Sequence, residues 1–225
     1  MHVWCASLNL PAWQTERLRQ TLSTDEQRRA SRFAFEKDRD HFVAARGILR
    51  AILGQYLDEA PDRLRFRYNP FGRPALAGDP DGLRFNVSHS HKLALFAVTR
   101  GRSIGVDVER IRPDVTYEQL ARQFFSRREV AALLALPKNL RREAFFNCWT
   151  RKEAYIKARG EGLSIPLQQF DVSLVPGEPA VLLSTEGDEA DRWSLRELDT
   201  GQDYAAALAV EGHGWRLRCW QWVVN

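Results

Sequence analysis

The segment Ile104-Gly-Val-Asp-Val-Glu109 decides much of how this sequence can fold. Apolar and acidic residues alternate along it, and a strand places side chains two residues apart on the same face. Val106 and Val108 therefore point to one side, and Asp107 and Glu109 point together to the other. Two carboxylates on one face repel each other unless a cation compensates them, and oxygen ligands select a hard cation such as Mg²⁺. The segment is typical either of a strand that carries a metal site or of a strand end with solvated charges.

A third carboxylate lies on a long helix further along the chain. The stretch Trp149-Thr-Arg-Lys-Glu153-Ala-Tyr-Ile-Lys157 falls within a helix predicted over residues 140–159. Glu153 and Lys157 are four residues apart and share one helix face. On an exposed helix they would form an ordinary ion pair worth roughly a few tenths of a kcal/mol. The aromatic residues around them indicate burial, and a buried Glu and Lys would need a partner such as a metal or a phosphate.

Two turns carry candidate phosphate contacts. The first, Phe85-Asn-Val-Ser88-His89-Ser90, ends a predicted strand, where hydroxyl, imidazole and backbone N–H groups can hold phosphate oxygens. The second, Asn69-Pro-Phe-Gly72-Arg73-Pro74, predicts a rigid turn from which Arg73 can reach a phosphate. Each is also consistent with a plain polar turn. No nucleophile-elbow glycines surround Ser88, which argues against a serine hydrolase.

The elements outside these motifs follow one plan twice. The first half predicts a strand at 2–8, a helix opening with the capping box Ser23-Thr-Asp-Glu26, a helix at 39–57, and strands at 63–68, 83–88, 93–99 and 104–109. The second half predicts helices at 116–124, 126–136 and 140–159, then strands at 170–174, 180–184, 193–198, 204–210 and 215–224. This plan predicts an α+β fold of two pseudo-duplicated α/β lobes, residues 1–102 and 103–225, with a ligand cleft between them.

Composition excludes several classes of protein. The 225 residues contain no apolar run long enough to cross a bilayer, and no secretory signal pattern opens the chain. Cys5, Cys148 and Cys219 are widely spaced and odd in number, so we expect neither a disulfide framework nor a zinc site, and a cytoplasmic location.

The charge is spread unevenly between the two predicted lobes. Residues 1–102 carry 17 Lys/Arg and 11 Asp/Glu, whereas the remaining residues carry 16 and 18. A basic half beside a slightly acidic half suits an anionic ligand held next to a carboxylate-bound cation, although chance gives such a split as readily. The basic residues are not interleaved with aromatic residues, so no nucleic-acid partner is expected.

The order of the motifs resembles a known family. The series is Gly72-Arg-Pro74, Phe85-Asn-Val-Ser-His89, Gly105-Val-Asp-Val-Glu109, Phe124-Phe-Ser-Arg-Arg-Glu129 and Trp149-Thr-Arg-Lys-Glu-Ala-Tyr-Ile-Lys157. It closely resembles the 4'-phosphopantetheinyl transferases, in particular the larger, monomeric kind that activates peptide and polyketide synthetases. The resemblance implies a monomer whose coenzyme A cleft lies between two lobes. It also implies Mg²⁺-dependent transfer of 4'-phosphopantetheine from coenzyme A to a serine of an apo acyl or peptidyl carrier protein, which releases 3',5'-ADP.

The resemblance also implies roles for individual residues. Asp107, Glu109 and Glu153 match the carboxylates around Mg²⁺, and Lys157 matches the cation on the transferring phosphate. Either Glu153 or a water held by Glu109 takes the proton of the acceptor serine. The residues implied to bind coenzyme A are Arg29, Gly72, Arg73, Pro74, Ser88, His89, Asp107, Glu153 and Lys157.

One position departs from the family pattern, and one further position matches it. Where relatives often carry a second basic residue, this chain has His41, so either His41 or Arg46 is expected to contact the 3'-phosphate. Glu129 matches a family glutamate with a structural or supporting role.

Two other functions remain as alternatives. One is a coenzyme A-binding homologue without catalysis, and the other is a magnesium-dependent phosphohydrolase that acts on a nucleotide. The presence of all three carboxylates and the lysine favours the transferase. The sequence leaves the acceptor open among carrier proteins of fatty acid, polyketide and nonribosomal peptide assembly, and leaves open whether acyl-coenzyme A is accepted.

Overall fold

The computed structural model describes residues 1–78, 82–162, 165–185, 187 and 189–223. The first half of the chain forms β1 (His2–Ser7), α1 (Ala12–Arg19), α2 (Thr24–Ala30), α3 (Glu36–Leu57), β2 (Phe66–Tyr68), β3 (Pro74–Leu76), β4 (Leu83–Ser90) and β5 (Leu93–Arg100). The second half forms β6 (Ile104–Arg110), α4 (Tyr117–Phe124), α5 (Arg127–Ala135), α6 (Lys138–Arg159), β7 (Asp171–Val172), β8 (Leu182–Ser184), β9 (Trp193–Glu197), β10 (Tyr204–Glu211) and β11 (Arg218–Gln221).

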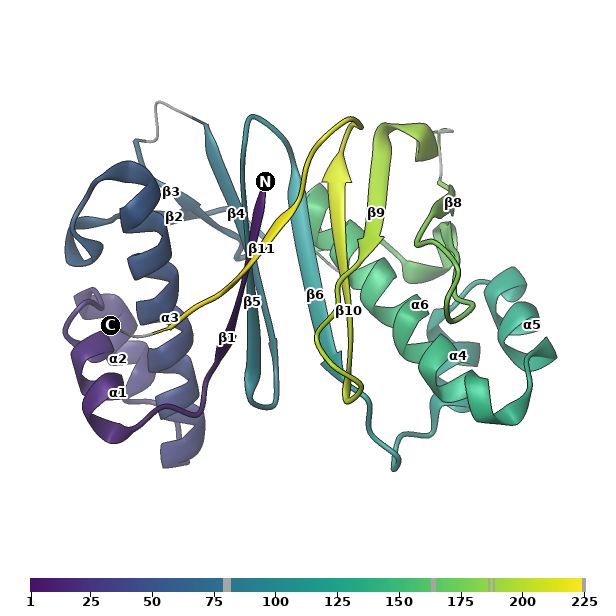
Figure 1. Ribbon diagram of the computed structural model, residues 1–225, viewed down its shortest axis with the longest axis horizontal. Coiled ribbons are helices and arrows are strands. Elements are labelled where there is room, and N and C mark those ends of the chain that lie inside the picture. The colour runs from purple at the N-terminus through teal and green to yellow at the C-terminus, as the bar shows by residue number, and fades with distance from the viewer. Residues whose placement is uncertain (79–81, 163–164, 186, 188, 224–225) are drawn as a thin grey trace.

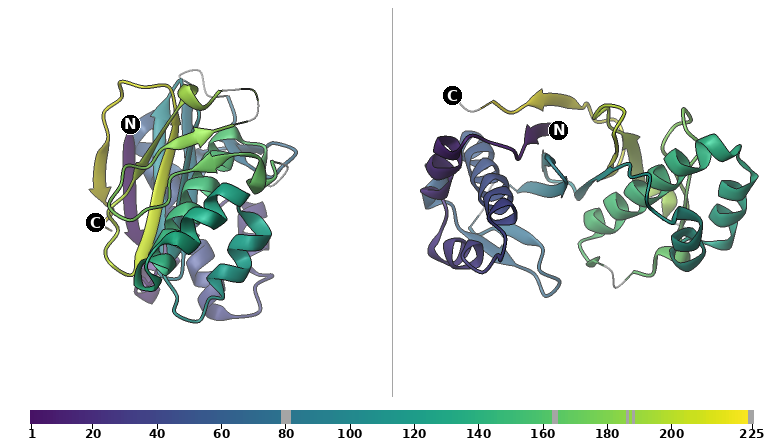
Figure 2. Two further views of the ribbon diagram at one scale, coloured as in Figure 1. Left: turned by 90° about the vertical axis from the view of Figure 1, so that its right-hand side faces the viewer. Right: turned by 90° about the horizontal axis from the view of Figure 1, so that it is seen from below.

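The strands lie between two groups of helices. Figure 1 shows α1–α3 on one side of the molecule, α4–α6 on the other, and the main strands in the middle. The strand orders are β11-β1-β5-β4 and β6-β10-β9. Figure 2 shows the C-terminal strand β11 reaching back from the second half, and it pairs in parallel with β1. The predicted α+β fold with two lobes is confirmed, while the boundary between residues 102 and 103 stays a prediction.

A seam of polar side chains joins the two large sheets. From Asn86 to the end of β4, every second side chain accepts a hydrogen bond from a backbone N–H of β6: Asn86 from Val106, Ser88 from Val108 and Ser90 from Arg110. The partners keep a constant offset along the chain, so β4 and β6 run in parallel. Short polar side chains therefore hold the two lobes together where a ladder of backbone hydrogen bonds would otherwise run.

Each lobe has its own apolar core. The 22-residue helix α3 buries Ala44, Ile48 and Ile52, whose spacing of four keeps them on one helix face. They pack with residues of β1, β4 and β5. The equally long α6 fills the second core together with side chains of β10. A third cluster, which includes Val3, Leu95 and Val106, covers the opposite face of the sheets in both lobes.

Several predicted boundaries were wrong, and the structure supplies reasons for two of them. The strand predicted over residues 63–68 begins only at Phe66. Before it, the Arg50 side chain donates hydrogen bonds to the carbonyls of Pro61 and Leu64, so the Leu64 carbonyl is not available to a neighbouring strand. The strand predicted over 170–174 ends at Val172, and the Arg151 side chain donates a hydrogen bond to the carbonyl of Ser173.

Other elements differ from the prediction, and no comparable hydrogen bond accounts for the difference. Helix α1 and strand β3 were not predicted, and α1 buries only Thr15 and Leu18, which leaves a weak pattern. The strand predicted over 215–224 is limited to β11, and Val224 lies outside the described residues.

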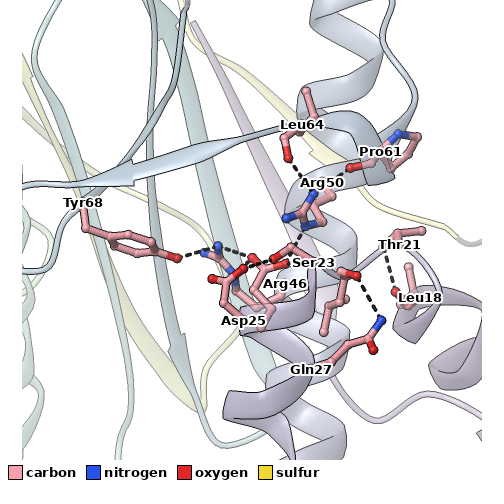
Figure 3. A network of polar contacts seen from close by, with 12 residues as sticks. Leu18, Thr21, Ser23, Asp25, Gln27, Arg46, Arg50, Pro61, Leu64 and Tyr68 are labelled. Carbon is pink, nitrogen blue, oxygen red and sulfur yellow. Dashed lines mark hydrogen bonds and ion pairs between the residues drawn. The ribbon is translucent and has the colours of Figure 1, made fainter.

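The predicted capping box anchors a buried ion-pair network in the first lobe. Glu26 accepts from the backbone N–H of Ser23 at 3.0 Å, as a capping box requires. The same carboxylate, only 3% exposed, also binds Arg46 and Arg50 of α3. Figure 3 shows both arginines turned toward α2, with Tyr68 meeting Arg46 from β2. Glu26 thus joins α2 to α3, and Arg46 extends the network to β2.

We predict that Glu26→Gln lowers the free energy of unfolding by about 3–5 kcal/mol at neutral pH, because the buried Arg50 and the partly buried Arg46 lose their counter-charge. Burial by itself raises the pKa of Glu26, but Arg46 and Arg50 outweigh it and hold that pKa below its ordinary value. The stabilisation is therefore complete above the ordinary carboxylate pKa and is lost as the pH falls through the lowered pKa.

Urea unfolding at a series of pH values measures this effect. The difference between wild type and Glu26→Gln should shrink in acid. Glu36→Gln removes an exposed glutamate paired with Arg39 and should change stability by less than about 1 kcal/mol. A pH-independent difference would contradict the ionised pair.

Candidate active site

The face of β6 that carries the carboxylates is turned toward α6. Gly105, Asp107 and Glu109 alternate with Val106 and Val108, as predicted, and the valines are buried in the cluster that covers the opposite face. A Cβ atom on Gly105 would overlap the backbone of α6 at Ala154 and Ala158. The helix therefore crosses β6 backbone to backbone, and glycine is required at the crossing.

This crossing brings Lys157 of α6 onto Asp107 of β6. The Lys157 Nζ lies 2.5 Å from Asp107 Oδ1. The Ser88 hydroxyl of β4 donates to the same oxygen at 2.7 Å. Asp107 is 2% exposed, and its second oxygen, Oδ2, is buried without a hydrogen-bond partner. A buried, unsatisfied carboxylate oxygen is costly unless a further cation or donor reaches it.

Ser90 repeats this arrangement one step along the seam. Its hydroxyl donates to Glu109 Oε2 at 2.8 Å and accepts from the backbone N–H of Arg110 at 3.1 Å. Each serine of the seam thus orients one carboxylate of β6 while joining the lobes. Ser90 was not predicted as a site residue. Its spacing of two from Ser88, matching that of Asp107 and Glu109, was the available signal.

The three carboxylates influence one another electrostatically. Burial raises the pKa of Glu109, and the charge of Asp107 raises it further. Burial also raises the pKa of Glu153, where Lys157 opposes the effect of Asp107 and Glu109. The predicted group of Asp107, Glu109, Glu153 and Lys157 therefore converges in one region. Within the described residues, no three acidic, histidine or cysteine side chains are already arranged as a metal site.

Four residues predicted to bind coenzyme A line one cavity. Arg29, Gly72, Pro74 and His89 surround a space of about 650 Å³ beside α3. Lys37 lines it too and was not predicted. Lys37 lies one helical turn before His41, and this position was the sequence signal for a second basic residue beside Arg29. Burial lowers the pKa of His89, and the positive charge of Lys157 lowers it further, which favours a neutral ring.

Three other predicted contacts have partners within the protein. Arg46 lines the cavity, but its guanidinium binds Glu26 and Tyr68. His41 also lines it, and its ring lies 2.8 Å from Asn9 Oδ1. Ser88 is buried and bonded to Asp107. Their contacts with coenzyme A stay predictions.

Arg73 lies apart from this cavity. It lines a neighbouring space of about 420 Å³, and its guanidinium donates to two carbonyls of the second lobe. Its predicted contact with coenzyme A also stays untested.

The predicted supporting role of Glu129 agrees with its surroundings. It lies 2.8 Å from Lys152 Nζ and accepts from the backbone N–H of Val172. Lys152 in turn donates to the carbonyls of Leu167 and Phe170. This buried pair fixes the segment that follows α6, one residue from Glu153.

Comparison with known families matches both halves of the chain. The model of the 4'-phosphopantetheinyl transferase superfamily matches residues 103–209, and that of the 4'-phosphopantetheinyl transferase N-terminal region matches residues 11–100. The 4'-phosphopantetheinyl transferase HetI of Nostoc is 44% identical over 225 residues, which cover 99% of this chain and 92% of that protein. The 4'-phosphopantetheinyl transferase Sfp of Bacillus subtilis is 30% identical over 72% of this chain and 70% of that protein.

The chain belongs to the 4'-phosphopantetheinyl transferase superfamily. The predicted family and activity are confirmed: it is an enzyme that transfers 4'-phosphopantetheine from coenzyme A to carrier proteins. A solved structure, holo-[acyl-carrier-protein] synthase of Thermotoga maritima, is similar with a TM-score of 0.40 and 22% identity, over 49% of this chain and 62% of that one.

Proposed function

We propose that this transfer requires Mg²⁺ and takes place at Asp107, Glu109, Glu153 and Lys157, with a serine of an apo acyl or peptidyl carrier protein as the acceptor. The observation that carries the proposal is the buried, unpartnered Oδ2 of Asp107, which lies on the same strand face as Glu109. An oxygen of this kind is suited to a hard cation.

The residues fit a magnesium ion. Asp107, Glu109 and Glu153 would hold it, since Asp107 and Glu109 share one strand face, and burial together with the charges of both raises the pKa of Glu153. When bound there, Mg²⁺ would supply positive charge to offset that of the coenzyme A pyrophosphate.

The chain's own groups supply the remaining chemistry. The Lys157 ammonium, already held 2.5 Å from Asp107, is placed to bind an oxygen of the transferring phosphate. Glu153 shares its helix face and is one candidate base. A water held by Glu109 remains the alternative. Either group would take the proton of the acceptor serine as the serine oxygen bonds to phosphorus and the bond from phosphorus to the departing 3',5'-ADP breaks.

We also propose that the enzyme acts as a monomer in the cytoplasm. The carboxylates, the lysine and the cavity come from a single chain, so no second copy is needed to complete the site. Cys5, Cys148 and Cys219 are free thiols, which suits a reducing compartment. No helix in the described parts of the chain is both long and apolar enough to span a membrane.

Intact-mass measurement of an apo carrier protein tests the proposed metal. Incubation with this enzyme, coenzyme A and Mg²⁺ should add one phosphopantetheine arm, and EDTA should abolish the gain until excess Mg²⁺ restores it. Unchanged transfer in EDTA would refute the metal requirement. Coenzyme A binding without any mass gain on fatty acid, polyketide or peptide carrier proteins would instead favour a non-catalytic homologue.

A further inference from the structure

The turn between β2 and β3 crosses from the first lobe to the end of the catalytic helix. Asn69 Nδ2 donates to the carbonyl of Gly160 at 2.8 Å. Arg73 Nη1 donates to the carbonyl of Ala158 at 3.1 Å. The last carbonyls of an α-helix have no partners within the helix, so donors from elsewhere must satisfy them. Here the donors come from the opposite lobe.

Arg73 joins two elements of the active site at once. Its second nitrogen, Nη2, donates to the carbonyl of Ile104 at 2.8 Å. Ile104 begins β6, the strand of Asp107 and Glu109, and Ala158 directly follows Lys157 on α6. A single planar guanidinium therefore spans the crossing of β6 and α6, next to Gly105.

Asn69 also makes the turn itself rigid. Its Oδ1 accepts from the backbone N–H groups of Phe71 and Arg73 at 3.0 and 2.8 Å. Its own backbone N–H donates to the carbonyl of Arg73. The side chain that reaches Gly160 thus also holds Arg73 in place, and the two residues act as one unit.

We infer that Asn69 and Arg73 form an interlobe clamp that positions the last turn of α6, and with it Lys157, against Asp107. They are positioning residues for the transfer reaction. This role differs from the coenzyme A contact expected for Arg73 from its sequence, and it does not depend on the proposed magnesium. Because Lys157 and Asp107 meet at 2.5 Å, a small displacement of the helix end would separate them.

Two variants disrupt the clamp, one while keeping the turn intact and the other while keeping the positive charge. Asn69→Asp keeps the acceptor oxygen of the turn but replaces the donor to Gly160 with a carboxylate, which a helix C-terminus repels. Arg73→Lys keeps the positive charge but cannot bind two carbonyls in the fork geometry of a guanidinium. Arg67→Gln, an exposed change on the same hairpin that lines the same cavity, is the control.

The measurements are steady-state kinetics and hydrogen–deuterium exchange of residues 154–160. Both clamp variants should lower kcat by about 10–100-fold, as a misplacement on the order of 1 Å does, with the KM for coenzyme A changed by less than about two-fold. Exchange at the end of α6 should speed up in both variants and stay unchanged in Arg67→Gln.

Hydrogen–deuterium exchange reports the position of the α6 end without reference to transfer activity. A raised KM for coenzyme A with unchanged exchange would make Arg73 a substrate contact and overturn the clamp. Unchanged exchange with unchanged kcat would overturn it as well.

Discussion

Asp107→Ala is expected to lower the rate of phosphopantetheine transfer by about 10²–10³-fold or more while the protein stays folded. The change removes the carboxylate that binds Lys157 and the buried oxygen proposed for the metal. Lys157 is 27% exposed, so its ammonium can be hydrated when its partner is lost, and the fold should survive. Intact-mass assays of the carrier protein measure the rate, and thermal unfolding verifies the fold.

A matched carboxylate serves as the control for this experiment. Glu211 ends β10 in the same sheet and also pairs with a serine and a basic residue, Ser103 and Arg192, away from the site. Glu211→Ala should retain near-normal transfer. Near-normal turnover of Asp107→Ala itself would remove Asp107 from the proposed mechanism.

Lys152→Met is expected to cost about 3–5 kcal/mol of stability, a larger loss than any exposed substitution. Lys152 is fully buried, and its ammonium is surrounded by Glu129 and by the carbonyls of Leu167 and Phe170. Replacing it with a chain of similar length leaves a buried carboxylate without its counter-charge and two carbonyls without donors. The urea midpoint of unfolding measures the loss.

The same substitution at the other end of α6 provides the comparison. Lys138 is exposed at the first position of that helix, so Lys138→Met should change stability by no more than about 0.5 kcal/mol. Equal stability of the two variants would contradict the charged pair of Lys152 and Glu129.

Much of the fold follows from local patterns in the sequence. The alternation in β6 and the capping box at Ser23 are local patterns, each set by residues within a few positions of one another. The order of five motifs also identified the family and the four residues at the crossing of β6 and α6. Elements with weak local patterns, such as α1 and β3, were missed because few of their side chains are buried.

The sequence by itself determined the class of fold, the family, and the carboxylates and lysine proposed to carry the reaction, because these depend on residue type and spacing along one strand or helix. The tertiary structure alone decided which side chains are already engaged. Arg46 turns to Glu26, Arg73 turns to the end of α6, and Ser90 turns to Glu109. Such pairings join residues far apart in the chain, and only the packing of the two lobes brings those donors and acceptors within hydrogen-bonding distance.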